Sequence, residues 1–186
     1  RGFVGGILML TVPFAPEIFA KFLQPQGWGS DYAALLGDYN RLAAMLIHGE
    51  DLPQATNRIT LNRARKDQYG LAIPRVHYQE HENTARLREY ALLKGRSVYE
   101  SLGAESVHDL VDVFPATHNM GTARMGTDSA SSVCNQWGQT HDVRNLFVSD
   151  GSLFTSAGCE NPTLTIVALA LRQGDYIQRL AREGAL

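Results

Sequence analysis

His118-Asn-Met-Gly-Thr-Ala-Arg-Met-Gly126, Asn145-Leu-Phe-Val-Ser-Asp-Gly-Ser152 and Asn161-Pro-Thr-Leu-Thr165 are three segments that organise the whole of this 186-residue sequence. The first is a histidine that leads into a loop punctuated by glycines, and the second is a short apolar strand that ends at Asp-Gly. The third opens a long apolar helix. Polar side chains gather at each of these junctions, so the pattern predicts that any chemistry is located between His118 and Tyr176.

The final helix is the longest element that the sequence predicts. It should start at Pro162, because proline lacks the N–H group that would be unpaired at a first helical position. Apolar residues cover most of its circumference, at Ile166, Val167, Ala168, Leu169, Ala170, Leu171, Ile177 and Leu180. Such a helix is buried against something large, and we expect this chain to be too small to bury it fully by itself.

The first half of the chain predicts an irregular start followed by a helix. Residues 1–29 are rich in Gly, Pro and aromatic residues, which favours irregular structure, although the apolar run 3–14 also suits a buried strand or turn. From Ser30 to about His48 apolar residues recur at three- and four-residue steps, as in an amphipathic helix. Gly49 would end that helix.

The middle of the chain predicts antiparallel strands and a second helix. Residues 57–62 and 73–78 alternate between apolar and polar, as half-buried paired strands do. A helix should follow over 82–102, and a third strand over 107–114; residues 132–135 and 145–149 are further short strand candidates. The expected fold class is therefore α+β, an antiparallel sheet with helices on one face.

Composition excludes several classes of protein. With 44% hydrophobic and 19% charged residues, the sequence is neither disordered nor membrane-like. A net charge of −2 gives no electrostatic basis for nucleic-acid binding, and the longest apolar run falls short of the ~20 residues that span a bilayer. Cys134 and Cys159 have neither zinc-finger spacing nor the count of a disulfide framework, so two buried thiols are expected. Localisation is left open.

His118 is the leading candidate for acid–base chemistry. A histidine titrates near neutral pH and can take a proton from a hydroxyl group, although the same residue also suits a capping or core role. The other five histidines are interpreted as surface or structural residues: His48, His77, His81, His108 and His141. His77 and His81 are four residues apart but lie in a strand-like pattern, so no metal site is predicted.

Asn161 and Asp150 each have a structural and a functional interpretation. Asn161 fits a helix cap, and the same helix start offers free N–H groups and partial positive charge to an anion. Asp150-Gly151 fits a turn, whereas an acid at the end of a strand can also bind cofactor hydroxyls. The chain has no Gly-x-Gly-x-x-Gly after an opening strand, no P-loop and no Gly-x-Ser-x-Gly.

Taken together, these segments resemble the C-terminal part of the glucose–methanol–choline (GMC) family of FAD-dependent oxidoreductases. The resemblance lies in four pieces that occur in the family's order: residues 118–126, Ser132-Val133, residues 145–152, and residues 161–165 with Ala168-Leu-Ala-Leu171. It covers about the last third of the chain. Weaker matches lie at residues 58–61 and 74–78, and residues 1–56 show little resemblance.

The resemblance implies roles for particular residues. His118 would act as general base while a hydride passes from the substrate carbon to N5 of FAD, and Asn161 would orient the substrate oxygen. Asp150 and Gly151 would contact the ribityl–pyrophosphate region of FAD. The amides around Asn161, Pro162 and Thr163 would face the pyrimidine edge of the flavin.

The resemblance also implies an organisation. Residues 1–140 would form a partial substrate-binding domain with an irregular and helical lead-in over 1–56, and residues 141–186 would supply the closing strand and helix of an α/β FAD-binding domain. The partner would be the N-terminal FAD-binding portion, and the substrate an alcohol or a sugar, so the chain alone should be inactive. A non-catalytic docking or assembly piece is the alternative, which retention of both His118 and Asn161 disfavours.

Overall fold

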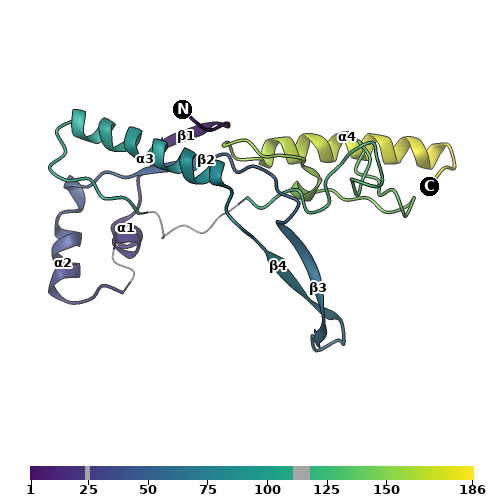
Figure 1. The fold of residues 1–186 in the computed structure, drawn as a ribbon, viewed down its shortest axis with the longest axis horizontal. Coiled ribbons are helices and arrows are strands. Elements are labelled where there is room, and N and C mark those ends of the chain that lie inside the picture. The colour runs from purple at the N-terminus through teal and green to yellow at the C-terminus, as the bar shows by residue number, and fades with distance from the viewer. Residues whose placement is uncertain (24–25, 111–117) are drawn as a thin grey trace.

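A computed structural model describes residues 1–23, 26–110 and 118–186. The N-terminal helices and strands lie at one end of an elongated molecule, the long last helix lies at the other, and a hairpin projects between them (Figure 1). The elements are β1 (Ile7–Thr11), α1 (Pro16–Leu23), α2 (Ser30–Gly37), η1 (Tyr39–Arg41), β2 (Met45–Gly49), β3 (Arg58–Lys66), β4 (Ala72–His77), α3 (Glu82–Ser101), η2 (Gly151–Leu153) and α4 (Thr163–Arg182). This arrangement confirms the α+β class. In the part that the structure describes, the strands form two separate two-stranded antiparallel sheets, β1–β2 and β3–β4.

The two-stranded β1–β2 sheet packs one face against α3. Leu87 and Ala91 of α3 are buried, and a Cβ atom at Gly95 would lie 3.1 Å from Ile47 Cδ1 and 3.5 Å from Met45 Sδ. Side chains alternate between the two faces of a strand. Met45 and Ile47 therefore point towards α3, and the even-numbered residues of β2 point away from it.

The helix expected from Ser30 to His48 is wrong in its second half. Helix α2 ends at Gly37, and Met45–Gly49 forms strand β2, paired with β1 from Ile7↔Gly49 to Thr11↔Met45. The apolar run Met45-Leu46-Ile47 fits either period over so short a length, and pairing with a distant strand decided the outcome. The irregular start expected for residues 1–29 is also wrong in part. The apolar run contains β1, as one of its two interpretations predicted, and α1 follows it.

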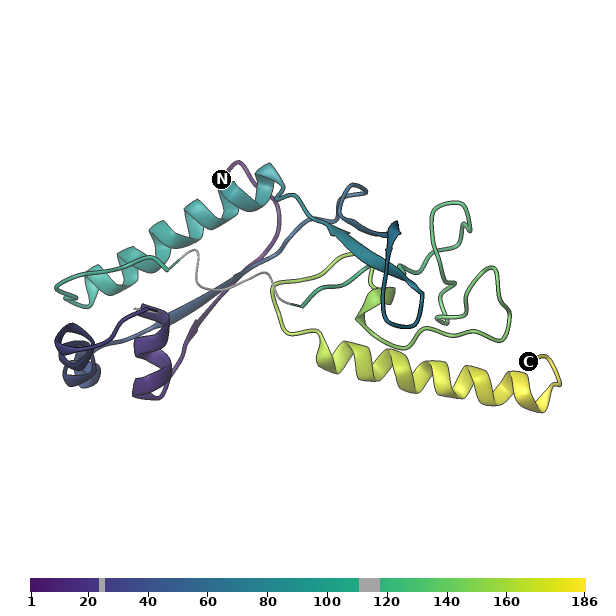
Figure 2. The same cartoon turned by 90° about the horizontal axis from the view of Figure 1, so that it is seen from below.

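The strands expected around residues 57–62 and 73–78 are confirmed as the antiparallel pair β3–β4. Their burial is not as expected, because the apolar face is the exposed one: Ile59 is 51% and Leu61 64% exposed, while Thr60 and Asn62 are less exposed. Figure 2, seen from below, looks towards the hairpin, which projects away from the rest of the molecule in Figure 1. The hairpin thus presents its apolar side chains to solvent.

The second predicted helix and the last one are confirmed as α3 and α4, and α4 begins one residue later than expected. Residues 107–110 of the strand expected over 107–114 are not in a strand, and the remainder lies outside the described residues. Residues 132–135 and 145–149 take part in isolated bridges, Cys134↔Thr140 and Gln139↔Phe147, instead of strands. Within the described ranges, no helix is both long and apolar enough to cross a membrane.

Helix α4 is half covered by the loops before it. Ile166, Leu169 and Ile177 are partly buried, whereas Leu164 is 85% and Leu171 69% exposed. The prediction that this chain does not bury the whole helix is confirmed.

Candidate functional site

The loop after His118 is paired along the backbone with η2. Gly121 N donates to Gly151 O at 3.2 Å, Ala123 N to Ser152 O at 2.9 Å, and Met125 N to Leu153 O at 2.8 Å. Two of the segments singled out in the sequence therefore lie side by side, although Met120 and Gly151 are far apart in the chain.

Gly151 sits in the junction between this loop and α4. A Cβ atom at Gly151 would lie 3.2 Å from Met120 Cγ and 3.4 Å from Ile166 Cδ1. Those distances are tighter than ordinary carbon contacts, so the absence of a side chain lets loop, turn and helix approach closely. The third segment is thereby joined to the other two.

Asp150 caps η2, as the turn interpretation predicted. Its Oδ1 accepts from Ser152 N at 2.7 Å and from Ser152 Oγ at 2.5 Å. The side-chain hydrogen bond from Ser152, followed by the backbone one, lowers the pKa of Asp150. The exposed carboxylate is therefore ionised near neutral pH, and within the described residues its Oδ2 has no donor.

His118 has an unusual backbone. Its φ is 58°, and among the described residues it is the only non-glycine with positive φ. Histidine is enriched in this left-handed region, yet the conformation costs of order 1 kcal/mol, and such strain is concentrated at functional sites. The side chain is exposed, and its ring lies 6.0 Å from the ring of His48 at an interplanar angle of 80°.

His48 belongs to the face of the β1–β2 sheet opposite α3. The register pairs His48 with Leu8 and Leu46 with Leu10, and directly paired residues point to the same side of a sheet. His118 thus lies over a face that carries one histidine among leucines. Glu50 follows on the same side, and its carboxylate accepts from Gly6 N at 3.0 Å.

Asn161 is exposed and precedes the first turn of α4. Pro162 is the cap residue and makes no side-chain cap hydrogen bond; its carbonyl accepts from Ile166 N at 3.0 Å. The expectation that Asn161 is the cap is therefore off by one position. Thr163 and Leu164 are exposed, and the N–H groups of a first helical turn have no partner within the helix.

The segment before Asn161 lies against the start of β1. A Cβ atom at Gly6 would be 3.1 Å from Cys159 Sγ, so both the Cys159 segment and the His118 loop border the β1–β2 sheet. Within the described chain, no hydrogen bond links His118 with Asn161. Cys134 is buried and Cys159 is half-buried, and both are free thiols, so burial of both was predicted too strongly.

Three other histidines have the structural roles that were predicted. His77 Nε2 contacts Thr60 Oγ1 at 2.8 Å, His81 Nδ1 accepts from Asn83 N at 3.0 Å, and His141 Nε2 contacts Ser132 Oγ at 2.9 Å. Among the residues that the structure describes, no group of three or more His, Cys, Asp or Glu side chains is placed to hold a metal ion.

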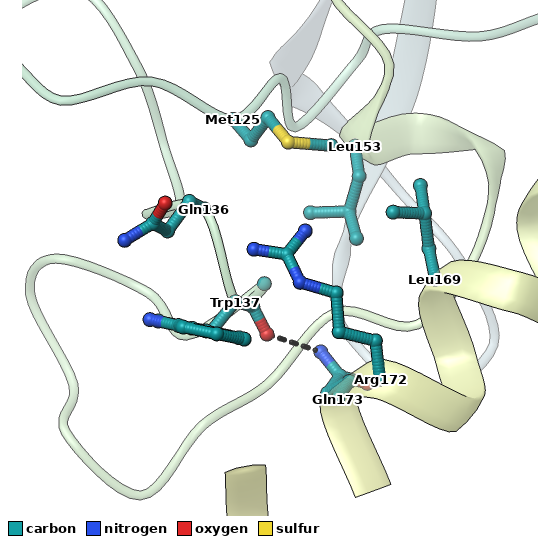
Figure 3. A pocket seen from close by; sticks show the side chains of 8 residues that line it. Met125, Gln136, Trp137, Leu153, Leu169, Arg172 and Gln173 are labelled. Atoms are coloured by element: carbon teal, nitrogen blue, oxygen red, sulfur yellow. Dashed lines mark hydrogen bonds between the residues drawn. The ribbon is translucent and has the colours of Figure 1, made fainter. Parts of the chain in front are cut away.

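The sequence did not indicate the importance of Gln173, which is buried on α4. Its Nε2 donates to Trp137 O at 3.0 Å and to Val148 O at 2.7 Å, and the neighbouring Arg172 guanidinium lies 4.2 Å from the centre of the Trp137 ring (Figure 3). The cavity among these side chains is about 10 Å³, the space of about one water molecule. This region is a packing contact between α4 and the loops before it, and the cavity is too small for a substrate.

Comparison with known proteins decides the family. The family model for GMC oxidoreductases matches residues 53–170. The chain belongs to the GMC oxidoreductase family. This is a family of flavin-dependent enzymes that oxidise alcohols and sugars, and the match includes His118, Asp150 and Asn161.

Several curated relatives agree with this membership. The chain is 40% identical to 2-methyl-1,2-propanediol dehydrogenase of Mycolicibacterium austroafricanum over 96% of this chain and 34% of the relative. It is 31% identical to the fructose dehydrogenase large subunit of Gluconobacter japonicus over 73% of this chain and 25% of the relative. It is 29% identical to the gluconate 2-dehydrogenase flavoprotein of Pantoea cypripedii over 90% of this chain and 29% of the relative. The chain thus spans between a quarter and a third of the length of these relatives.

The first of these alignments also takes in most of residues 1–56. The sequence segments alone gave little resemblance there, so that expectation was too narrow. The similarity to this relative therefore extends to β1, β2 and His48. His48 was interpreted as a surface or structural residue, because a histidine in an apolar run assigned to a helix gives no sign of the loop that will lie above it.

Proposed function

We propose that this chain is the C-terminal portion of a flavin-dependent oxidoreductase that oxidises a hydroxyl group of an alcohol or a sugar. The observation that carries the proposal is the placement of His118. Its exposed imidazole is held at a positive φ over the leucine-lined face of β1–β2, in the segment that the family model matches. Family membership supports the reaction class, and the site supports the roles given below.

In this proposal His118 is the general base that takes the hydroxyl proton of the substrate. A positioned proton acceptor contributes roughly 10² to 10⁴ in rate. Asn161 orients the substrate oxygen through its exposed side-chain amide. The apolar face of β1–β2 lines the site and excludes water from it.

The residues at the start of α4 and η2 fit FAD. The ionised Asp150 has an oxygen available for a flavin hydroxyl, and Gly151 brings the backbone close because no side chain intervenes. Asn161, Pro162 and Thr163 surround a helix N-terminus whose free N–H groups favour negative charge. FAD bound there would accept the substrate hydride at N5, and the protein residues would position the reactants and stabilise charge.

We assign residues 1–140 to substrate binding and residues 141–186 to the closing part of an FAD-binding domain. The rest of that domain would come from an N-terminal portion, consistent with the greater length of the relatives. It would cover the exposed apolar residues of α4, Leu164, Val167 and Leu171. Without it the chain should neither hold FAD tightly nor turn over. A non-catalytic docking piece is the rival role.

The test is His118→Ala in the complete enzyme, compared with the matched variant His108→Ala, whose histidine is exposed and lies between Val107 and Asp109, two residues that bond Arg96 of α3. His118→Ala should slow substrate-driven bleaching of the flavin band at least about a hundredfold, with the bound flavin retained. His108→Ala should behave like the wild type. Normal bleaching in His118→Ala would refute the assignment of the base, and a complete protein without flavin would support the docking role.

A further inference from the structure

Among the described residues, the ring of His48 lies beside that of His118 and makes no hydrogen bond of its own. The rings of His77, His81 and His141 are each engaged in a hydrogen bond. The two rings of the His48–His118 pair are nearly perpendicular, at 80°. This arrangement directs the edge of one ring at the face of the other, and no hydrogen bond joins them within the described residues.

The surroundings of His48 favour a ligand contact. It is half-buried and points away from α3, alongside Leu8 and Leu46 of the same sheet face. The nearby Glu50 is already bonded to Gly6 N. Within the described residues the His48 ring nitrogens make no hydrogen bond and are not buried from solvent, so a substrate hydroxyl can take the place of water there.

We infer that His48 is a second substrate-binding residue, which hydrogen-bonds the hydroxyl adjacent to the one that His118 deprotonates, and that it selects vicinal diols over simple alcohols. The inference rests on the proposed function. The two oxygens of a vicinal diol are carried by neighbouring carbons, so two hydrogen bonds of about 2.8 Å can connect them to two rings 6.0 Å apart. The relative that acts on 2-methyl-1,2-propanediol takes a substrate of this class.

The experiment measures kcat/KM of the complete flavin-loaded enzyme for 2-methyl-1,2-propanediol and for 2-methyl-1-propanol, which lacks the second hydroxyl. His48→Ala should lower kcat/KM for the diol about tenfold, the value of one hydrogen bond, and leave the monoalcohol within about twofold. His48→Phe keeps a ring without a donor and should match His48→Ala. His48→Gln keeps a hydrogen-bonding group and should recover part of the preference for the diol.

Two controls separate this inference from the proposed function. His118→Ala should lower kcat/KM for both substrates by at least about a hundredfold, and His108→Ala for neither. Equal losses for both substrates in His48→Ala, or a wild-type diol preference in His48→Phe, would show that His48 only packs against His118 and would overturn the inference. A wild-type enzyme with no preference for the diol would overturn it as well. Absence of flavin-dependent alcohol oxidation in the wild type would overturn the proposed function, and this inference with it.

Discussion

The loops of residues 118–153 and the β3–β4 hairpin combine secondary structure and burial in opposite ways. The loops contain little regular secondary structure, yet Cys134 and Leu153 are almost fully buried and Gln173 of α4 bonds two of their carbonyls. The hairpin is an extended strand pair with a register shift between Asn62 and Lys66, yet Leu61 is 64% and Val76 72% exposed. Regular backbone pairing and burial therefore do not coincide in this chain.

The difference shows which region the chain completes from its own residues. The loops are folded on one another and on α4, and they hold the candidate catalytic residues in place. The two strands of the hairpin pair only with each other, and they leave an apolar face uncovered, as does the outer side of α4. These uncovered faces are where the remaining length of a GMC enzyme would pack, according to the proposal above.

Gly138→Ala should have the largest effect on stability, because it disrupts the packed loops of residues 118–153. Gly138 has φ 73°, and a Cβ atom there would lie 2.6 Å from Val148 O and against Gln173. Left-handed strain and a clash with backbone together should cost more than about 3 kcal/mol. We expect loss of the folded loops, seen as a large drop in the thermal midpoint of the chain.

Gly174→Ala is the matched control for that variant. Gly174 lies within α4, and an added Cβ atom there would meet no atom within 4 Å. The change should raise stability by up to about 1 kcal/mol, because alanine is the better helix former. Equal destabilisation by both variants would show that the loops are not the well-packed region described here.

Gln173→Ala should have the next largest effect. It removes both hydrogen bonds from the Gln173 amide and leaves the carbonyls of Trp137 and Val148 without that donor. The cost should be about 2–3 kcal/mol in the free energy of unfolding, measured by chemical denaturation. Gln178→Ala, at an exposed position on the same helix, should change stability by less than about 0.5 kcal/mol.

Leu61→Thr tests whether the exposed apolar face of the β3–β4 hairpin is covered in the complete enzyme. In the 186-residue chain it should change the free energy of unfolding by less than about 0.5 kcal/mol, because the side chain is already exposed. In the complete enzyme it should cost about 1–2 kcal/mol, because the face is then covered. Paired thermal melts measure both. Equal small effects in the two contexts would contradict the idea that this face is covered.

Ser152→Ala should have the smallest effect on stability, and its main result should be a change in the pKa of Asp150. Loss of the Ser152 hydroxyl removes the larger cause of the lowered pKa of Asp150, so that pKa should rise towards its ordinary value, as an NMR titration of the carboxyl would show. A lowered pKa stabilises the fold above the unfolded-state pKa, and that stability is lost as pH falls through the folded-state value. The variant should therefore lose less stability on acidification. An unchanged pKa would show that the hydroxyl does not contribute.

The sequence was informative where local pattern and tertiary structure agree. Helices α3 and α4 have long apolar periods and clear ends, and the alternation in β3 and β4 survives in the fold. Strand β2 was assigned to a helix because Met45-Leu46-Ile47 is too short to fix a period, and pairing with β1 depends on residues nearly forty positions away. Residues 132–135 and 145–149 were expected as short strands because their apolar runs are strand-like, but the turn that Gly138 N closes on Asn135 O leaves only isolated bridges there.

The candidate site was predictable to a similar degree. His118, Asp150 and Asn161 stand at junctions that the sequence marks, and the resemblance gives them expected roles. His48 and Gln173 carry no local signal, because one depends on which face of β2 meets the His118 loop and the other on carbonyls supplied by distant turns. Such residues become visible only once the chain is folded.

The most direct test of the proposed function is a visible absorption spectrum of the complete enzyme, recorded without oxygen before and after 2-methyl-1,2-propanediol and a panel of other alcohols and sugars are added. The account predicts a flavin band that bleaches with at least one hydroxyl substrate. A complete protein that is colourless, or whose flavin band is unchanged by every substrate in the panel, would contradict it.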